Sequence, residues 1–213
     1  MTILPHLEFY LRPLPGYAMV QPLIEAAALR QWNRTHRPPA PRSVKSAAVR
    51  RFAGRANRTT FVETGTFFGD MVAAVRDDFD SLYSIELHRG LGARATRRFA
   101  DDPKVSIVIG DSGAELEPLL RALAAPAVLW LDGHYSGALT ARGDSDTPVL
   151  RELDGAFRGG TVNDVVLIDD ARLFGLDPAY PTIIEVERRM RLTRPDWVLR
   201  VEDDIVQLFP MNG

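Results

Sequence analysis

Short apolar runs alternate with longer amphipathic stretches along most of the chain, from about residue 59 to residue 192. The apolar runs are typical of buried strands, and the stretches between them carry apolar residues at helical spacing. This alternation predicts an α/β fold with a mostly parallel sheet and helices on both faces. We expect strands near 59–63, 81–87, 105–110, 128–131 and 164–168, and helices near 70–78, 88–100, 113–124, 149–158 and 181–192.

The last apolar runs, 197–201 and 205–209, lie on either side of three acidic residues. Two strands joined by so short a connection must be antiparallel. The sequence therefore predicts that a C-terminal antiparallel hairpin closes the sheet.

The first 58 residues do not share this alternation, and we expect a helical arm there, followed by one domain over 59–213. A helix is expected at 21–32, with Pro22 near its first turn, and a second at 43–55, with Ser43 as its N-cap. The proline-rich segment 37–41 is a stiff connector between them. The arm could cover the sheet edge, form a lid over a ligand or make a homodimer contact, and the pattern does not choose.

The composition, 46% hydrophobic and 25% charged residues, is ordinary for a globular domain of 213 residues. The absence of cysteine excludes disulfides, thiolate zinc sites and a cysteine nucleophile. No signal-peptide pattern and no stretch of 18 apolar residues is present, so we expect a cytoplasmic protein with no membrane partner.

The charge is unevenly distributed along the chain. Residues 1–58 hold ten Arg or Lys and two Glu, a balance of +8, and the remainder holds 16 basic and 26 acidic residues, a balance of −10. A basic arm suits nucleic acid, anionic lipid or an acidic partner, or it lies on the acidic body of its own or a neighbouring subunit. Only two of the 26 basic residues are lysines, a bias that a genome-wide habit would produce, so nucleic-acid binding is not the favoured interpretation.

The stretch 59–70 is a strand followed by a glycine turn and a helix start. Glu63 comes directly before Gly65, and Gly69 precedes the helix. Such a turn places backbone N–H groups and a helix N-terminus at the mouth of the sheet. It is not a phosphate-binding loop, because no Gly-Lys-Ser/Thr follows, and it lacks the third glycine of the full dinucleotide pattern.

Acidic residues end three successive predicted strands. Glu86 follows Gly69 by 17 residues, the place from which an acid accepts hydrogen bonds from ribose hydroxyls. Asp111 and Ser112 end the third strand. A helix N-cap or a turn contact explains any one of these acids, but explains all three less well.

These motifs, in this order, resemble the first three motifs of class I S-adenosylmethionine (SAM)-dependent methyltransferases, over roughly residues 59–210. The resemblance implies a Rossmann-like domain that binds SAM across the carboxyl ends of strands one to four, with the glycine turn at the methionine part, Glu86 at the ribose and Asp111 near the adenine. The cofactor-binding residues that it implies are Glu63, Gly65, Thr66, Phe67, Gly69, Asp70, Glu86, Leu87, Asp111, Ser112 and Asp132.

Within that class, Asp132, Asp169 and Asp170 resemble the metal positions of Mg²⁺-dependent O-methyltransferases, and the nearest group is that of the macrocin O-methyltransferases (TylF/MycF-like). Carboxylate oxygens suit Mg²⁺, which would hold a substrate hydroxyl and lower its pKa. Neighbouring residues of a strand point to opposite faces, so Asp169 and Asp170 converge only if the chain turns there. Otherwise one of them caps a turn.

His134 and Asp132 are the expected catalytic residues, with His134 as general base or, alternatively, as a structural hydrogen-bond partner. A catechol-type enzyme would use a lysine on this loop, but none follows Lys104. Tyr135 and Arg142 are expected near the substrate, and Arg172, which follows the aspartate pair, is expected to balance its charge. We expect O-methylation of a small hydroxylated molecule; the alternative is a nucleic-acid-binding or non-catalytic protein of this fold.

Overall fold

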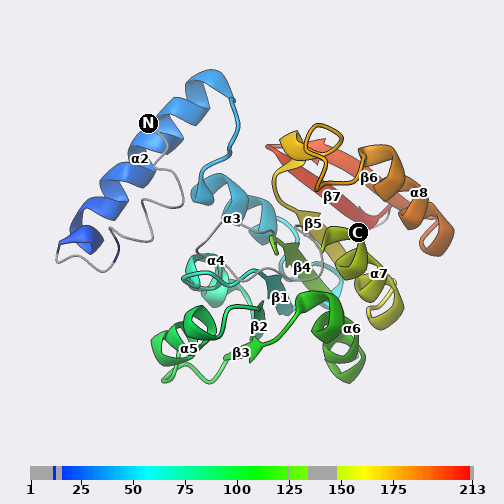
Figure 1. Cartoon of the computed structure of the whole chain (residues 1–213), viewed down its shortest axis with the longest axis horizontal. Helices are drawn as coiled ribbons and strands as arrows, with labels where there is room; N and C mark the ends of the chain where they lie inside the picture. The colour runs from blue at the N-terminus through cyan, green and yellow to red at the C-terminus, as the bar shows by residue number, and fades with distance from the viewer. Residues whose placement is uncertain (1–11, 13–15, 124, 134–147, 212–213) are drawn as a thin grey trace.

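The computed structural model describes residues 12, 16–123, 125–133 and 148–211. The chain forms one seven-stranded sheet with the strand order β3-β2-β1-β4-β5-β7-β6 (Figure 1). The strands are β1 (Thr60–Thr64), β2 (Ser81–Glu86), β3 (Val105–Ile109), β4 (Ala127–Leu131), β5 (Val165–Ile168), β6 (Trp197–Glu202) and β7 (Ile205–Pro210).

Helices cover both faces of the sheet (Figure 1). The helices among the described residues, apart from three short 3₁₀ turns, are α2 (Tyr17–Thr35), α3 (Arg42–Arg50), α4 (Asp70–Val75), α5 (Arg89–Arg98), α6 (Ser112–Leu123), α7 (Val149–Gly159) and α8 (Ile183–Thr193). Helices α3, α4 and α5 pack on one face, and α6, α7 and α8 pack on the other. No helix among the described residues is long and apolar enough to cross a membrane.

The first five strands are parallel, and the last two are antiparallel, as the sequence predicts. Every residue of β1, β4 and β5 is buried, because both faces of the sheet are covered. Strand β7 lies between β5 and β6, and Asp203 and Asp204 turn the hairpin with left-handed φ angles of 54° and 63°. The predicted fold class is confirmed.

The arm differs in detail from the prediction. Helix α2 begins at Tyr17 instead of residue 21, so Pro22 lies inside it. Helix α3 begins at Arg42, and its N-cap is Pro41, not Ser43. The Ser43 N–H donates to Glu25 Oε1 of α2 at 2.7 Å. A carboxylate of the neighbouring helix thus takes the role expected of the serine hydroxyl.

Helix α3 belongs to the core although it precedes residue 58. Its Ala48 and Val49, with Phe52 just after it, pack against Phe61 of β1 in one cluster of buried residues. Helix α2 instead extends away from the sheet (Figure 1). Helix α3 therefore shares one core with the strands.

Candidate functional site

The turn after β1 brings the chain into close contact with the end of β4. Gly65 has φ +79°, and a Cβ atom there would lie 2.3 Å from the carbonyl oxygen of Asp132. Gly69 has φ +75°, and a Cβ there would lie 2.6 Å from the Phe99 ring. Both positions require glycine for conformation and for space. The turn between them is thereby held at the carboxyl ends of β1 and β4.

A buried chain of polar groups links this turn to β2. The Ser84 hydroxyl donates to Glu63 Oε2 at 2.6 Å and lies 2.6 Å from the Thr66 hydroxyl. Because Ser84 has one hydroxyl hydrogen, Thr66 is the donor in the second contact. Burial raises the pKa of Glu63 well above its ordinary value, and the charges of Asp132 and Glu86 raise it further. Glu63 and Thr66 are thus fixed inside the predicted site.

Glu86, at the last position of β2, faces the turn. Its Oε2 accepts the N–H of Phe67 at 2.8 Å, and its Oε1 accepts the N–H of His88 at 2.8 Å. Phe67 has a left-handed φ of 49° within this turn. Burial raises the pKa of Glu86. A carboxylate has about four lone-pair positions, so two acceptor positions are left for ligand hydroxyls.

The third acid has a structural role that the sequence left open. Asp111 Oδ1 accepts the N–H of Gly113 at 3.0 Å, a contact typical of the start of a helix, here α6. Both Asp111 oxygens also accept from Arg151 of α7, at 2.8 and 2.6 Å. Ser112 is buried beside it, and Leu87 is half-buried after β2. Asp111 and Ser112 follow the end of β3, where the resemblance places the adenine.

Asp70 is engaged by arginines. Its carboxylate pairs with Arg12 of the arm, with Arg42 of α3 at 2.7 Å and with Arg98 of α5 at 2.7 Å. These charge-assisted hydrogen bonds oppose the cost of burial and hold the pKa of Asp70 below its ordinary value. Asp70 therefore ties the arm to the turn, a role that its place in the sequence motif does not indicate.

Asp132, Asp169 and Asp170 follow β4 and β5, which are neighbours in the sheet. Asp170 has a left-handed φ of 60°, so the chain turns where the two adjacent aspartates would otherwise diverge. Burial raises the pKa of Asp169 to about 7, and the charges of Asp132 and Asp170 contribute to the increase. Burial raises the pKa of Tyr180, and the charges of Asp170, Asp132 and Asp169 raise it further. The structure thus brings the three aspartates into one electrostatic cluster, beside a tyrosine that the sequence did not suggest.

Two cations pair with aspartates of this cluster. Lys45 of α3 donates its Nζ to Asp169 Oδ2, although the two residues are 124 positions apart in sequence. Arg172 donates to Asp170 Oδ1 at 2.7 Å and also pairs with Asp204 of the hairpin. The interpretation of Arg172 as a balancing charge is confirmed. Lys45 was missed, because nothing near it in sequence relates it to the end of β5.

The cluster does not fit a magnesium ion. Within the described part of the chain, no group of three or more His, Asp or Glu side chains is placed to hold a metal. Asp169 Oδ2 is bound to Lys45, and Asp170 Oδ1 is bound to Arg172. The Mg²⁺ site predicted from the aspartates has no support in this geometry. His134, Tyr135 and Arg142 lie outside the described residues, so their predicted roles are not tested.

Glu152 of α7 is a further residue that the sequence did not indicate. It is fully buried, and within the described structure neither of its oxygens has a hydrogen bond of normal geometry. Burial raises the pKa of Glu152 to about 7, and the charges of Asp132 and Asp111 also raise it. The nearby Ser112 and Thr64 hydroxyls lower the pKa but do not cancel this increase. A signal was present: Val149, Glu152 and Leu153 have the spacing of one buried helix face.

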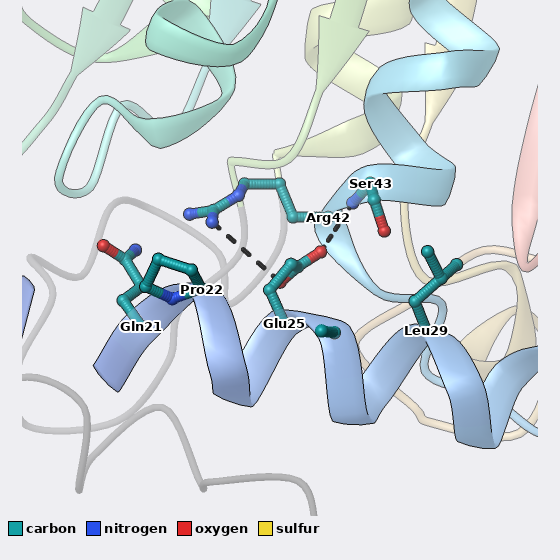
Figure 2. Close-up of a pocket in the computed structure, with 7 residues that line it drawn as sticks. Gln21, Pro22, Glu25, Leu29, Arg42 and Ser43 are labelled. Atoms are coloured by element: carbon teal, nitrogen blue, oxygen red, sulfur yellow. Dashed lines mark hydrogen bonds and ion pairs between the residues drawn. The ribbon is translucent and has the colours of Figure 1, made fainter. Parts of the chain in front are cut away.

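A hollow of about 390 Å³ lies between the two arm helices (Figure 2). Glu25 stands in its wall, hydrogen-bonded to the backbone of Ser43 and 3.9 Å from Arg42 (Figure 2). Arg42 reaches from there to Asp70. The hollow is therefore built from the arm and is connected to the turn after β1 through one arginine.

No protein-family description matches the chain, and no curated protein matches it. Solved structures share its fold. The O-methyltransferase TomG from Streptomyces achromogenes, involved in tomaymycin synthesis and crystallised with SAM, aligns with TM-score 0.58 and 19% identity over 100% of both chains.

Two further structures show the breadth of this fold. The methyltransferase PaMTH1 of Podospora anserina, bound to S-adenosylhomocysteine (SAH), aligns with TM-score 0.55 and 12% identity over 92% of this chain and 97% of that one. An rRNA methylase from Streptococcus thermophilus aligns with TM-score 0.51 and 9% identity over 78% of this chain and 94% of that one. At these identities the likeness establishes the fold and leaves the activity open.

Proposed function

We propose that the protein is a SAM-dependent methyltransferase that methylates a hydroxyl group of a small molecule. The observation that carries this proposal is the arrangement of Glu86, whose carboxylate is fixed by the N–H groups of Phe67 and His88 opposite the glycine turn. In an α/β sheet of this kind, ligands bind at the carboxyl ends of the strands, where this carboxylate lies. TomG and PaMTH1, which share the fold, were crystallised with SAM and SAH.

The residues at the strand ends fit the parts of SAM. The remaining acceptor positions of Glu86 suit two ribose hydroxyls, and the tight turn between Gly65 and Gly69 lets the methionine part approach the backbone closely. Glu63 holds this turn through Ser84 and Thr66. When bound, SAM supplies an electrophilic methyl group on a sulfonium sulfur.

The acceptor would bind beside the aspartate cluster, at the ends of β4 and β5. The acceptor oxygen would form a bond to the methyl carbon of SAM while the carbon–sulfur bond breaks. The electron pair of the broken bond would return to sulfur, and the product would be SAH. The hydroxyl proton leaves to a base, for which an Asp132 carboxylate oxygen is our first choice and His134 the second. Holding the oxygen in line is the main contribution expected of the surrounding side chains. No magnesium enters this scheme, because the aspartates do not fit one.

The alternative, a nucleic-acid-binding protein that uses the basic arm, keeps one supporting observation, the rRNA methylase of the same fold. Against it, much of the arm's charge is used within the chain. Six of its ten basic residues pair with acids or polar groups elsewhere in the fold: Arg12, Arg42, Lys45, Arg50, Arg51 and Arg58. We therefore place a small-molecule acceptor first. The predicted homodimer stays a prediction.

Calorimetry with SAM and SAH tests the proposal on the wild type, Glu86→Gln and Glu185→Gln. Glu185 is an exposed acid on α8, outside the residues assigned to SAM, and is the matched control. A hydrogen bond to a charged group contributes about 1.5–3 kcal/mol, so Glu86→Gln should bind at least about tenfold more weakly. Glu185→Gln should bind as the wild type does. The absence of SAM and SAH binding by the folded wild type would refute the proposal.

A second experiment separates the two functions. Transfer of a labelled methyl group to polyols or phenols would support the small-molecule acceptor. Binding of RNA that weakens steeply as salt rises would instead support the alternative, because each neutralised phosphate releases a counterion.

A further inference from the structure

We propose that Lys45, supplied by the arm helix α3, takes the place of a divalent metal ion at the aspartate cluster and is the positioning residue of the acceptor site. The effect of Lys45 on catalysis rests on the proposed function. The test of this inference also has a readout that does not depend on activity.

The ammonium group of Lys45 occupies the coordination space of Asp169. Its Nζ donates to Asp169 Oδ2, and Asp169 Oδ1 accepts the N–H of Asp170 at 2.8 Å. The Asp169 side chain is 3% exposed and that of Lys45 is 17% exposed, so solvent screens the pair little. Both carboxylate oxygens of Asp169 are thus already in use.

The charges around Lys45 match those around a metal ion. Asp169, Asp132 and Asp170 all act on the ammonium, and their attraction outweighs the cost of its burial. Arg172 donates to Asp170 Oδ1, so two fixed cations supply the two positive charges that Mg²⁺ would bring. A divalent ion also needs several carboxylate oxygens directed at one point. Here one oxygen of Asp169 is directed at Lys45, and one oxygen of Asp170 is directed at Arg172.

The place of Lys45 in the fold explains how this charge is held. Ser46, Ala48 and Val49 are buried, so α3 is fixed against the sheet. Lys45 thus reaches the end of β5 from a packed helix. Through Asp169 it sets the orientation of the cluster beside which the acceptor hydroxyl would bind. The sequence offered no lysine on the loop after β4, and the arm provides one from across the site.

The test measures Mn²⁺ binding by electron paramagnetic resonance in metal-free buffer. It compares the wild type with Lys45→Met, which keeps the side-chain length without the charge, Lys45→Arg, which keeps the charge, and Lys104→Met. Lys104, the only other lysine, lies before β3 and donates to the carbonyl of Phe79. The double variant Lys45→Met/Asp169→Asn shows whether a new ion binds at the cluster.

We expect no specific Mn²⁺ site in the wild type, Lys45→Arg or Lys104→Met, and at least tenfold tighter Mn²⁺ binding in Lys45→Met. The double variant should lose this gain. Methyl transfer by the wild type should be unchanged by a chelator, and Lys45→Met should lose turnover while SAM binding changes less than threefold.

Two results would overturn the proposal: one tight Mn²⁺ ion in the wild type that Asp169→Asn removes, or no gain of Mn²⁺ affinity in Lys45→Met. If Lys45→Met does not fold, as circular dichroism would reveal, wild-type Mn²⁺ binding and its loss in Asp169→Asn decide the question. Calorimetry with SAM keeps the two proposals apart. Failure to bind SAM removes the proposed function, whereas the Mn²⁺ result concerns the cluster alone.

Discussion

Ser84 of β2 donates its hydroxyl to the buried carboxylate of Glu63 on β1, and the two residues are direct neighbours in the register of the parallel pair. The contact joins the strand that ends in the glycine turn to the strand that ends in Glu86. Because the pKa of Glu63 is raised mainly by burial, its carboxylate depends on the few donors that reach it.

Ser84→Ala should therefore destabilise the fold. It removes the donor to Glu63, and a buried acceptor left without its partner costs about 1–3 kcal/mol. We also expect weaker SAM binding, because Thr66 loses the same partner. Urea denaturation and calorimetry measure the two effects.

Ser81→Ala is the matched control for Ser84→Ala. Ser81 lies in the same strand and contacts the Thr60 hydroxyl at 3.1 Å, but at the end of the strand remote from the site. Its loss should leave SAM binding unchanged. Equal effects of the two variants on SAM binding would contradict the role given to Ser84.

Gly65→Ala should disrupt the turn, whereas Gly54→Ala should not. Both glycines have left-handed φ angles, +79° and +72°, so both variants pay about 1–2 kcal/mol for a Cβ in that region. A Cβ at Gly65 would also collide with the Asp132 carbonyl oxygen at 2.3 Å, whereas one at Gly54 meets nothing within 4 Å. The difference between their free energies of unfolding measures the collision. Equal losses would show that the turn and β4 are not in contact.

Glu152→Gln should change how stability depends on pH. The pKa of Glu152 is about 7 in the folded protein, above its ordinary value of 4.5, so the folded state holds the proton more tightly. The free energy of unfolding then falls as pH rises from about 4.5 through about 7, and levels off above that. The variant lacks this loss and should be more stable than the wild type at pH 8, by at most about 3 kcal/mol.

Denaturation with urea at pH 5, 6, 7 and 8 measures this difference. Asp169, with a pKa also near 7, contributes the same trend to both proteins. The difference between the free energies of unfolding of the wild type and the variant therefore isolates the contribution of Glu152. Parallel curves for the two proteins would show that Glu152 ionises normally in the folded state.

Asp70→Asn should loosen the arm. The neutral amide no longer pairs with Arg12, Arg42 and Arg98, and we expect a loss of about 1–3 kcal/mol. Trypsin should then cleave within residues 12–42 faster than in the wild type. Asp77→Asn is the control, because the Asp77 side chain is 93% exposed. A cleavage rate that does not respond to Asp70→Asn would mean that other contacts hold the arm.

The sheet was predictable because its signals are local. The run 128–131 is entirely apolar and became the central strand β4, and the short connection at Asp203 required an antiparallel hairpin. Glu63 and Glu86 were identifiable because each follows an apolar run at a spacing that the strand–turn–helix unit fixes.

The rest depends on contacts between distant parts of the chain. Lys45 and Asp169 are 124 residues apart, and no periodic pattern relates them. The cap of α3 came from Glu25 of another helix, so Ser43 was a reasonable but wrong choice. Glu152 lay on a visible apolar face, yet which groups surround it depends on how α7 packs on the sheet.

The position of β7 has a consequence for how the molecule assembles during synthesis. Among the strands of this sheet, residues 205–210 are the last to be synthesised, yet they lie inside the sheet, between β5 and β6. Until they emerge, β5 presents an open edge that can pair with other chains. Arg51, just after α3, bonds to Gln207 of β7, 156 residues later. Helix α3 is therefore made early but is fully anchored only after β7 has been synthesised. Premature release of the nascent chain would expose an aggregation-prone intermediate.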